Sequence, residues 1–238
     1  MERFANRDVC DIIISDYVTG KPIMYIDYAN ANSTELTGEA VYAYGGHNHV
    51  KRVTFQGERA GTLTLESQIQ TFELYQLITG GTFSDSANFV KREKLVCTEG
   101  VLTLSNVPSN DTVNVYLASD DCGEAIEATV SEKEVTVTGG VDGTAYVVYY
   151  TTNLDGVKAL SIGANNFPTD VRIDGETFMK TESGMLVPYK MVAWKAAVQP
   201  NITWGFANSG DPQSLTITFD LMPDFQNDDR ILDLIMEA

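Results

Sequence analysis

The sequence has little of what common classes of enzyme and nucleic-acid-binding protein use. Its 238 residues carry 16 Lys and Arg against 33 Asp and Glu, a net charge of −17, which disfavours a basic patch for DNA or anionic membrane. Three cysteines, Cys10, Cys97 and Cys122, are widely spaced and odd in number, which is typical of reduced thiols in a protein made in the cytosol. No apolar run approaches the roughly 20 residues that span a bilayer, and no leader pattern is evident, so we expect neither membrane anchoring nor Sec-type export.

Motifs that carry catalysis are also missing. The sequence has no G-x-S-x-G elbow, no glycine-rich phosphate loop with its lysine and no H-E-x-x-H pair. Its two histidines, His47 and His49, would share one face of a strand, but a zinc site needs three or four ligands and no further ligand stands at usable spacing. We therefore predict no catalytic residue, no metal and no cofactor.

Alternation of apolar and polar residues dominates the sequence and predicts a mainly β protein. An opening hairpin is expected from DIIIS and PIMYIDY around the turn at Thr19–Lys21, and Leu63 and Leu65 should face one way in GTLTLES. Strand signals then recur about every ten residues, separated by turn residues, as in antiparallel sandwiches and barrels. NITWGFA (201–207) and SLTITFDLMPD (214–224) predict further strands, and DDRILDLIMEA (228–238) predicts a closing helix with Asp228 as its N-cap.

One short helix interrupts this pattern. From Thr71 the periodicity becomes helical, and Gly80–Gly81 supplies the stop. The apolar residues cover an arc wider than one sheet can shelter, so we expect a second copy of the chain to cover the rest. The residues expected at this contact between subunits are Phe72, Leu74, Tyr75, Leu77 and Ile78.

Residues 29–49 predict a long loop after the second strand. The segment is rich in small and polar residues, and a connection of this length inside a compact domain is usually functional or disordered. Tyr42 and Tyr44 set it apart from a simple linker.

Two alternatives to a purely structural protein stay open. Tyr146, Tyr149 and Tyr150, with Trp194 and Trp204, could form a platform for stacking sugars, as in a carbohydrate- or receptor-binding β-sandwich, although such residues are more often core or cross-strand pairs. A pair of carboxylates could also serve a glycoside hydrolase, although most Asp and Glu residues lie on solvated strand faces.

Several segments together resemble the major tail tube protein of long-tailed bacteriophages. They are the opening strand pair, the long loop, GTLTLES running into TFELYQLITGG, and the ending from FPTDVRIDGETFMK through LTITFDLMPD. The likeness spans nearly the whole chain, and the type VI secretion tube proteins resemble the same fold. It implies a β-barrel or sandwich with one flanking helix, and we expect one domain over residues 1–238. Residues 98–153 depart from the likeness, because this stretch is longer than a minimal tube subunit requires, and we expect a sandwich-like insertion or an extension of the barrel there.

The resemblance also implies a function. Hexameric rings would stack into a tube that conducts DNA without holding it, in a virion tail assembled in the host cytoplasm. Partners would be further copies of the chain and other tail proteins: tape measure, baseplate hub, terminator and, in a contractile tail, the sheath. The long loop would reach the neighbouring ring, and its candidate stacking residues are Glu35, Leu36, Tyr42, Tyr44, His47 and His49.

Overall fold

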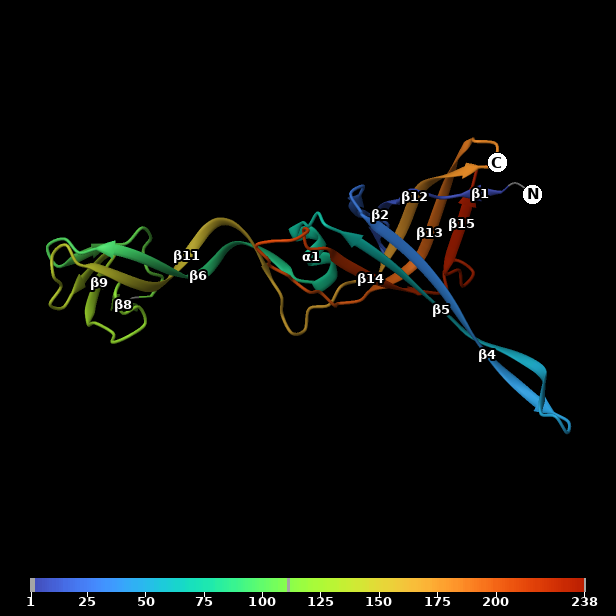
Figure 1. The fold of residues 1–238 in the computed structure, drawn as a ribbon, viewed down its shortest axis with the longest axis horizontal. Helices are drawn as coiled ribbons and strands as arrows, with labels where there is room; N and C mark the ends of the chain where they lie inside the picture. Colours follow the sequence, from blue (N-terminus) through green and yellow to red (C-terminus); the bar gives the residue numbers. More distant parts are fainter. Residues whose placement is uncertain (1–2, 111, 238) are drawn as a thin grey trace. The chain divides into compact units, whose positions relative to one another are not determined.

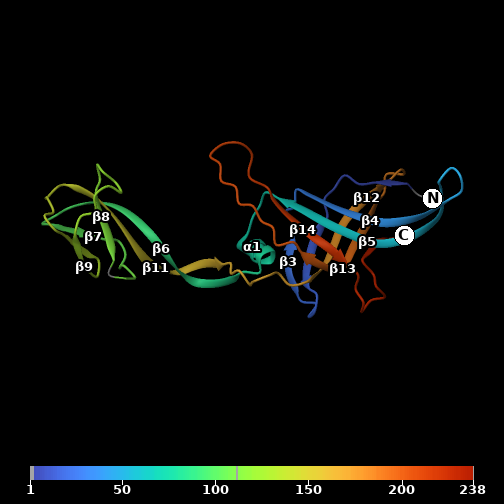
Figure 2. The ribbon, with the colours of Figure 1, turned by 90° about the horizontal axis from the view of Figure 1, so that it is seen from below.

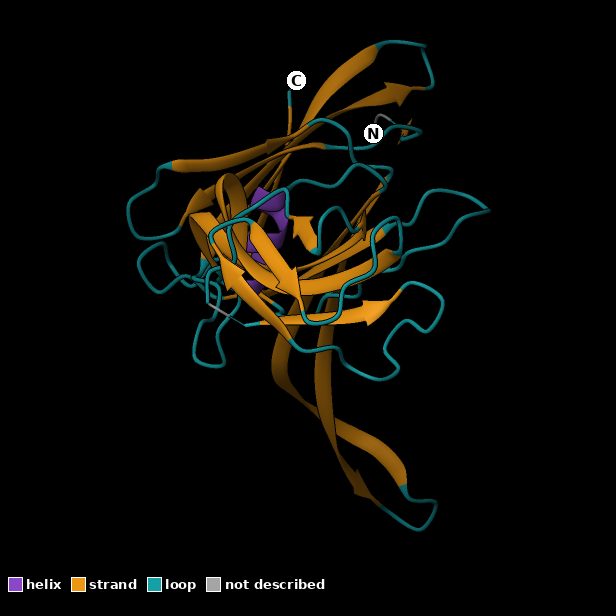
Figure 3. Ribbon diagram, turned by 90° about the vertical axis from the view of Figure 1, so that its left-hand side faces the viewer, coloured by secondary structure: helices purple, strands orange, loops and turns teal. Residues whose placement is uncertain are grey.

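The computed structural model describes residues 3–110 and 112–237. The chain divides into two compact units: unit 1 comprises Met1–Thr82 and Ile162–Ala238, and unit 2 comprises Phe83–Ser161. Strands account for most of the regular structure in both, and the sheets are antiparallel (Figure 3). The mainly β fold with one short helix is therefore as the sequence predicts. The segment 98–153, expected as an insertion or extension, lies within unit 2.

Unit 1 is built on one large sheet with the strand order β3-β2-β12-β13-β14-β5-β4, to which β1 and β15 add by pairing with β12 and β13 (Figure 1). Its strands are β1 (Phe4–Ala5), β2 (Asp11–Asp16), β3 (Pro22–Ile26), β4 (Ala31–Gly45), β5 (Val50–Ser67), β12 (Val171–Thr181), β13 (Leu186–Val198), β14 (Leu215–Met222) and β15 (Leu232–Met236).

The core of unit 1 follows the predicted alternation. Leu63 and Leu65 of β5 are fully buried, and Ile217 and Phe219 of β14 lie beside them in register. The opening hairpin also forms: Asp16 accepts hydrogen bonds from the backbone and hydroxyl of Thr19, and Gly20 takes the positive φ of 67° that the turn needs. Period-two patterning is thus sufficient to place these strands and their buried faces.

The helix α1 (Phe72–Thr79) forms where the periodicity changes. Thr71 caps its N-terminus by accepting a hydrogen bond from Leu74 N at 3.2 Å, and Gly80 ends it with a φ of 66°. A side chain is excluded at Gly80 because an added Cβ would lie 2.4 Å from the backbone of Phe167. The cap therefore also fixes how closely the segment after β11 approaches the helix.

The predicted long loop at 29–49 is wrong, because most of it is strand. β4 occupies Ala31–Gly45 and pairs with β5 almost along its whole length, with register shifts at Gly38/Ala40 and Ala43/Tyr44. The small and polar residues of this segment predict a loop because they lack the alternating apolar residues of a half-buried strand. A two-stranded ribbon with both faces in solvent can form without that alternation. Backbone pairing is what orders this segment.

Two predictions near the C-terminus are also wrong. No strand forms at residues 201–207, where Ile202 packs against the core and Trp204 lies edge-on to Tyr75. The closing helix is replaced by β15, which pairs with Tyr189–Ala193 of β13. Asp228 has a φ of 56° and lies in a turn, so it cannot be an extended N-cap. The C-terminal segment is a strand because its pairing with β13 outweighs its local helical periodicity.

Unit 2 has its own core between two small sheets, β7-β10-β9 and β6-β11-β8. Val135, Val148 and Leu102 are fully buried in it. The strands are β6 (Thr82–Val96), β7 (Val101–Thr103), β8 (Val113–Leu117), β9 (Ala128–Ser131), β10 (Glu134–Val137) and β11 (Ala145–Ser161).

Candidate functional site

The hairpin of β4 and β5 projects from the rest of unit 1 as an arm, defined here as residues 38–57 (Figures 1 and 2). Register gives it two different faces. Val41 lies opposite Phe55 and Ala43 lies opposite Val53, so these four side chains form an apolar face. The large members of this face are exposed: Val41 by 64%, Val53 by 49% and Phe55 by 58%.

The opposite face of the arm is aromatic and basic. Lys51 Nζ lies 3.7 Å from the centre of the Tyr42 ring, and the rings of Tyr44 and His49 stack with centroids 5.1 Å apart. His47 and His49 lie in the turn between the two strands, not on one face of a strand as alternation suggested. Since His49 stacks on Tyr44, its role in the arm is packing.

Glu35 and Leu36, the other two candidates for ring stacking, lie on β4 closer to the body and on opposite sides of the sheet. Leu36 faces the core side, where its Cδ2 would meet a side chain added at Gly61 at 2.8 Å. Glu35 pairs with Thr62 on the outer side. The six candidates from the long segment are therefore brought to one hairpin but not to one surface.

More of the apolar side of helix α1 is buried within the chain than the sequence predicts. Leu74 and Ile78 are fully buried and Leu77 is nearly so, all within the core of unit 1. The expectation that the chain leaves this arc uncovered is wrong for these three residues, because they belong to the core that the sheet of unit 1 forms, against which Ile202 also packs. Phe72 stays exposed and Tyr75 is half-buried.

An aromatic surface remains beside the helix, and we call it the α1 patch: Phe72, Tyr75, Ile162, Phe167 and Trp204. The ring of Tyr75 contacts Phe72 and stands edge-on to Trp204, with centroids 5.9 and 5.7 Å apart. Next to Trp204 lies a hollow of about 300 Å³, lined also by Ile162, Phe167 and Ile202. The patch is a surface of exposed apolar side chains without a partner in the described chain.

The outer face of β4, β5 and β14 has a different character. Register places Ser33, Thr64 and Thr218 in one row and Glu35, Thr62 and Asp220 in the next. The strand segments 31–37, 61–67 and 215–222 contain acidic residues but no lysine or arginine. Apart from Ala31 and Met222, this polar face therefore presents hydroxyls and carboxylates.

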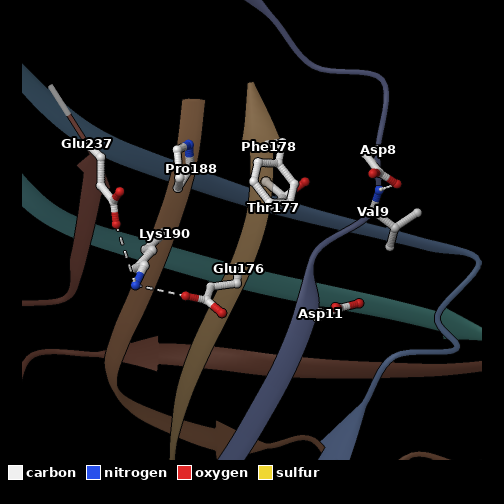
Figure 4. A pocket seen from close by; sticks show the side chains of 9 residues that line it. All are labelled: Asp8, Val9, Asp11, Glu176, Thr177, Phe178, Pro188, Lys190 and Glu237. Carbon is white, nitrogen blue, oxygen red and sulfur yellow. Dashed lines mark hydrogen bonds and ion pairs between the residues drawn. The ribbon is translucent and has the colours of Figure 1, made fainter. Parts of the chain in front are cut away.

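A groove on the outer side of β2, β12, β13 and β15 is also acidic (Figure 4). Lys190 Nζ lies 2.8 Å from a Glu176 carboxylate oxygen and 3.9 Å from one of Glu237, and both ion pairs are exposed. Asp8 and Asp11 line the same groove of about 340 Å³. Among the described residues, no group of His, Cys, Asp and Glu is placed to hold a metal ion. The arrangement is a solvated ion-pair network.

The model of the YomU/Tube protein family matches residues 6–232. The chain belongs to this family. Its members are phage-derived tube proteins, so this YomU/Tube member is a structural protein of a phage tube and a component of a virion tail that assembles with other tail components. Enzymatic activity is not expected of the family. A search of curated proteins gave no match. The described part of the chain has no helix long and apolar enough to cross a membrane.

In this YomU/Tube protein the tyrosines that could form a sugar-binding platform are not free to stack on a sugar. Tyr146 and Tyr150 are buried in the core of unit 2, whereas Tyr149 hydrogen-bonds to Asp121 and receives a hydrogen bond from Arg92. Trp194 belongs to unit 1, where Arg172 and Arg230 lie over its ring and Asp233 accepts from its indole nitrogen. Two of the three tyrosines are therefore buried and the third is held by hydrogen bonds, so the three do not form an exposed platform.

Unit 2 of the protein contains a polar network that sequence analysis missed. Glu93 accepts hydrogen bonds from Tyr150 Oη at 2.7 Å and from Ser105 N at 3.1 Å, and Lys91 Nζ lies 2.8 Å from it. Burial alone would raise the pKa of Glu93, but the hydrogen bonds from Lys91, Ser105 and Tyr150 outweigh it and lower the pKa to about 2. The residues are distant in sequence, so no local pattern indicates the network.

Proposed function

We propose that this chain is the major tube subunit of a long-tailed phage, and that six copies form a ring and rings stack into a tube that conducts DNA. The observation that carries the proposal is the arm, because a two-stranded ribbon with an uncovered apolar face is marginal alone and gains stability when another molecule covers it. Family membership supports the same conclusion.

The free edges of the large sheet support ring closure. Among the described residues, β3 pairs only with β2 at one end of the strand order, and β4 pairs only with β5 at the other. Unpaired edges are templates for pairing with another chain. Contact between two different edges of one protein is heterologous, and such contacts close into rings when the rotation permits. Six copies would be the closed form.

The polar face is our candidate for the wall of the lumen. DNA is held through lysine and arginine contacts to its phosphates, and this face has acidic and hydroxyl groups in their place. A wall lined by Glu35, Glu66 and Asp220 would repel phosphates, so that DNA passes without binding.

Shortening the arm tests this proposal. Gly38 and Arg59 are paired across β4 and β5, so replacing residues 39–58 with Asn-Gly closes the ribbon with a two-residue turn. The wild-type protein at high concentration should form tubes under the electron microscope, and the shortened variant should fold but form no tubes. Wild-type protein that stays monomeric under conditions favouring assembly would refute the proposal.

A further inference from the structure

The apolar face of the arm is exposed, and no other described part of the chain covers it. All residues from 46 to 60 are exposed, including Phe55 and Val53. Lys51 and Arg52 are the basic residues of the arm and Glu39 is its acidic residue, so the arm is net positive in a protein whose net charge is −17. Its partner should combine exposed apolar side chains with negative charge.

The α1 patch has both properties. It joins exposed aromatic rings to the hollow beside Trp204. The segments that form it, residues 69–81, 162–169 and 199–214, include Glu73 and Asp211 and contain no lysine or arginine. A second copy of the arm would meet an apolar surface with acidic residues nearby.

The positions of the two surfaces in the fold also suit each other. The arm tip lies at the start of β5, and α1 follows the end of the same strand (Figure 1). At about 3.3 Å per residue, the 18 residues of β5 separate the two surfaces by roughly 60 Å. The arm and the α1 patch lie at opposite ends of β5, so a contact between the arm of one copy and the patch of another is heterologous. Each copy in such a contact still has one unoccupied arm or patch, so the contact can repeat from one copy to the next.

We infer that the apolar face of the arm, Val41, Ala43, Val53 and Phe55, docks on the α1 patch of a second copy in the adjacent ring. The inference rests on the proposed tube function and specifies which surface receives the arm. Phe55 and Val53 pack against Trp204, Phe167 and Phe72, and the net positive charge of the arm favours its approach to the acidic side of the patch. The exposed part of α1 thus contacts another subunit, although its buried residues do not.

Cysteine cross-linking between two differently tagged copies tests the contact. In a background of Cys10→Ala and Cys122→Ser, which leaves only the buried Cys97, one copy carries Phe55→Cys and the other carries Phe167→Cys. Under mild oxidation and conditions that give tubes, the tagged heterodimer should form at least tenfold faster than when the second copy carries Thr216→Cys. Thr216 is an exposed control on the polar face of the same unit.

A matched pair of arm variants adds a second readout. Phe55→Asp places a charge on the apolar face, and Thr54→Asp places the same charge on the opposite face beside Tyr42. Only Phe55→Asp should abolish stacking. Tubes that form while Phe55→Cys cross-links equally well to Thr216→Cys, or to neither position, would overturn the docking surface and leave the tube function intact. Absence of both tubes and cross-links would overturn both.

Discussion

At the scale of single residues, Glu93 ties the stability of unit 2 to pH. Its side chain is 11% exposed, and its pKa is lowered from the ordinary value of 4.5 to about 2. Because the folded state prefers the ionised form, this stabilisation is present above about pH 4.5 and is lost as the pH falls toward 2. The effect is on the order of 2 kcal/mol once residual solvent screening is allowed for.

Glu93→Gln should therefore destabilise unit 2 at neutral pH by about 2 kcal/mol and flatten its stability between pH 4.5 and 2. Hydrogen exchange read by mass spectrometry resolves unit 2 from unit 1. Glu127→Gln, which changes an exposed carboxylate in the same unit, is the control and should leave the profile unchanged. An unaltered pH profile in Glu93→Gln would show that the network does not stabilise the fold.

Two neighbouring residues of α1 should separate folding from assembly. Leu74 is fully buried, so Leu74→Ala should cost about 2–5 kcal/mol of unfolding free energy, measured by denaturant titration. Phe72 is exposed, so Phe72→Ala should change that free energy by less than about 1 kcal/mol while weakening tube formation. Equal stability losses in the two variants would contradict the burial described for the helix.

At the scale of elements, the sequence was informative wherever local pattern and tertiary packing agree. Leu63 and Leu65 alternate and are buried, and Thr71 and Gly80 mark the ends of the helix. Predictions from the sequence are wrong where pairing with a distant segment determines the secondary structure. Residues 232–236 form the strand β15, and not a helix, because they pair with β13. The arm is ordered by cross-strand pairing that its small and polar residues do not indicate, and the core that buries Leu74 includes residues far from it in sequence, such as Ile12 and Ile217.

The polar face leads to a prediction about DNA. Thr64→Lys with Thr218→Lys places two lysines side by side on the face proposed as the lumen wall. Tubes of this variant should retain duplex DNA in a salt-sensitive way, whereas wild-type tubes should not. Two lysines at exposed neutral positions of unit 2, Thr129→Lys and Ser131→Lys, are the control for added positive charge. Equal retention by both variants in a sedimentation assay would remove the polar face from the lumen.

At the scale of the whole molecule, the two units have separate cores and, we propose, separate tasks. Unit 1 holds the arm, the α1 patch and the free sheet edges, and the described residues of unit 2 include a hydrophobic core cluster of nine buried side chains. Replacing residues 83–161 with a short Gly/Ser linker should leave a protein that still forms tubes in electron micrographs. A folded variant that no longer assembles would assign unit 2 a part in the tube contacts.

The most direct test of the account is cryo-electron microscopy of the purified wild-type protein after assembly. We predict a hollow tube of stacked six-membered rings, with Phe55 of each copy against Trp204 and Phe167 in the adjacent ring and the threonines of β5 and β14 facing the lumen. Assemblies in which the apolar face of the arm remains in solvent, or a preparation that contains only monomers, would contradict it.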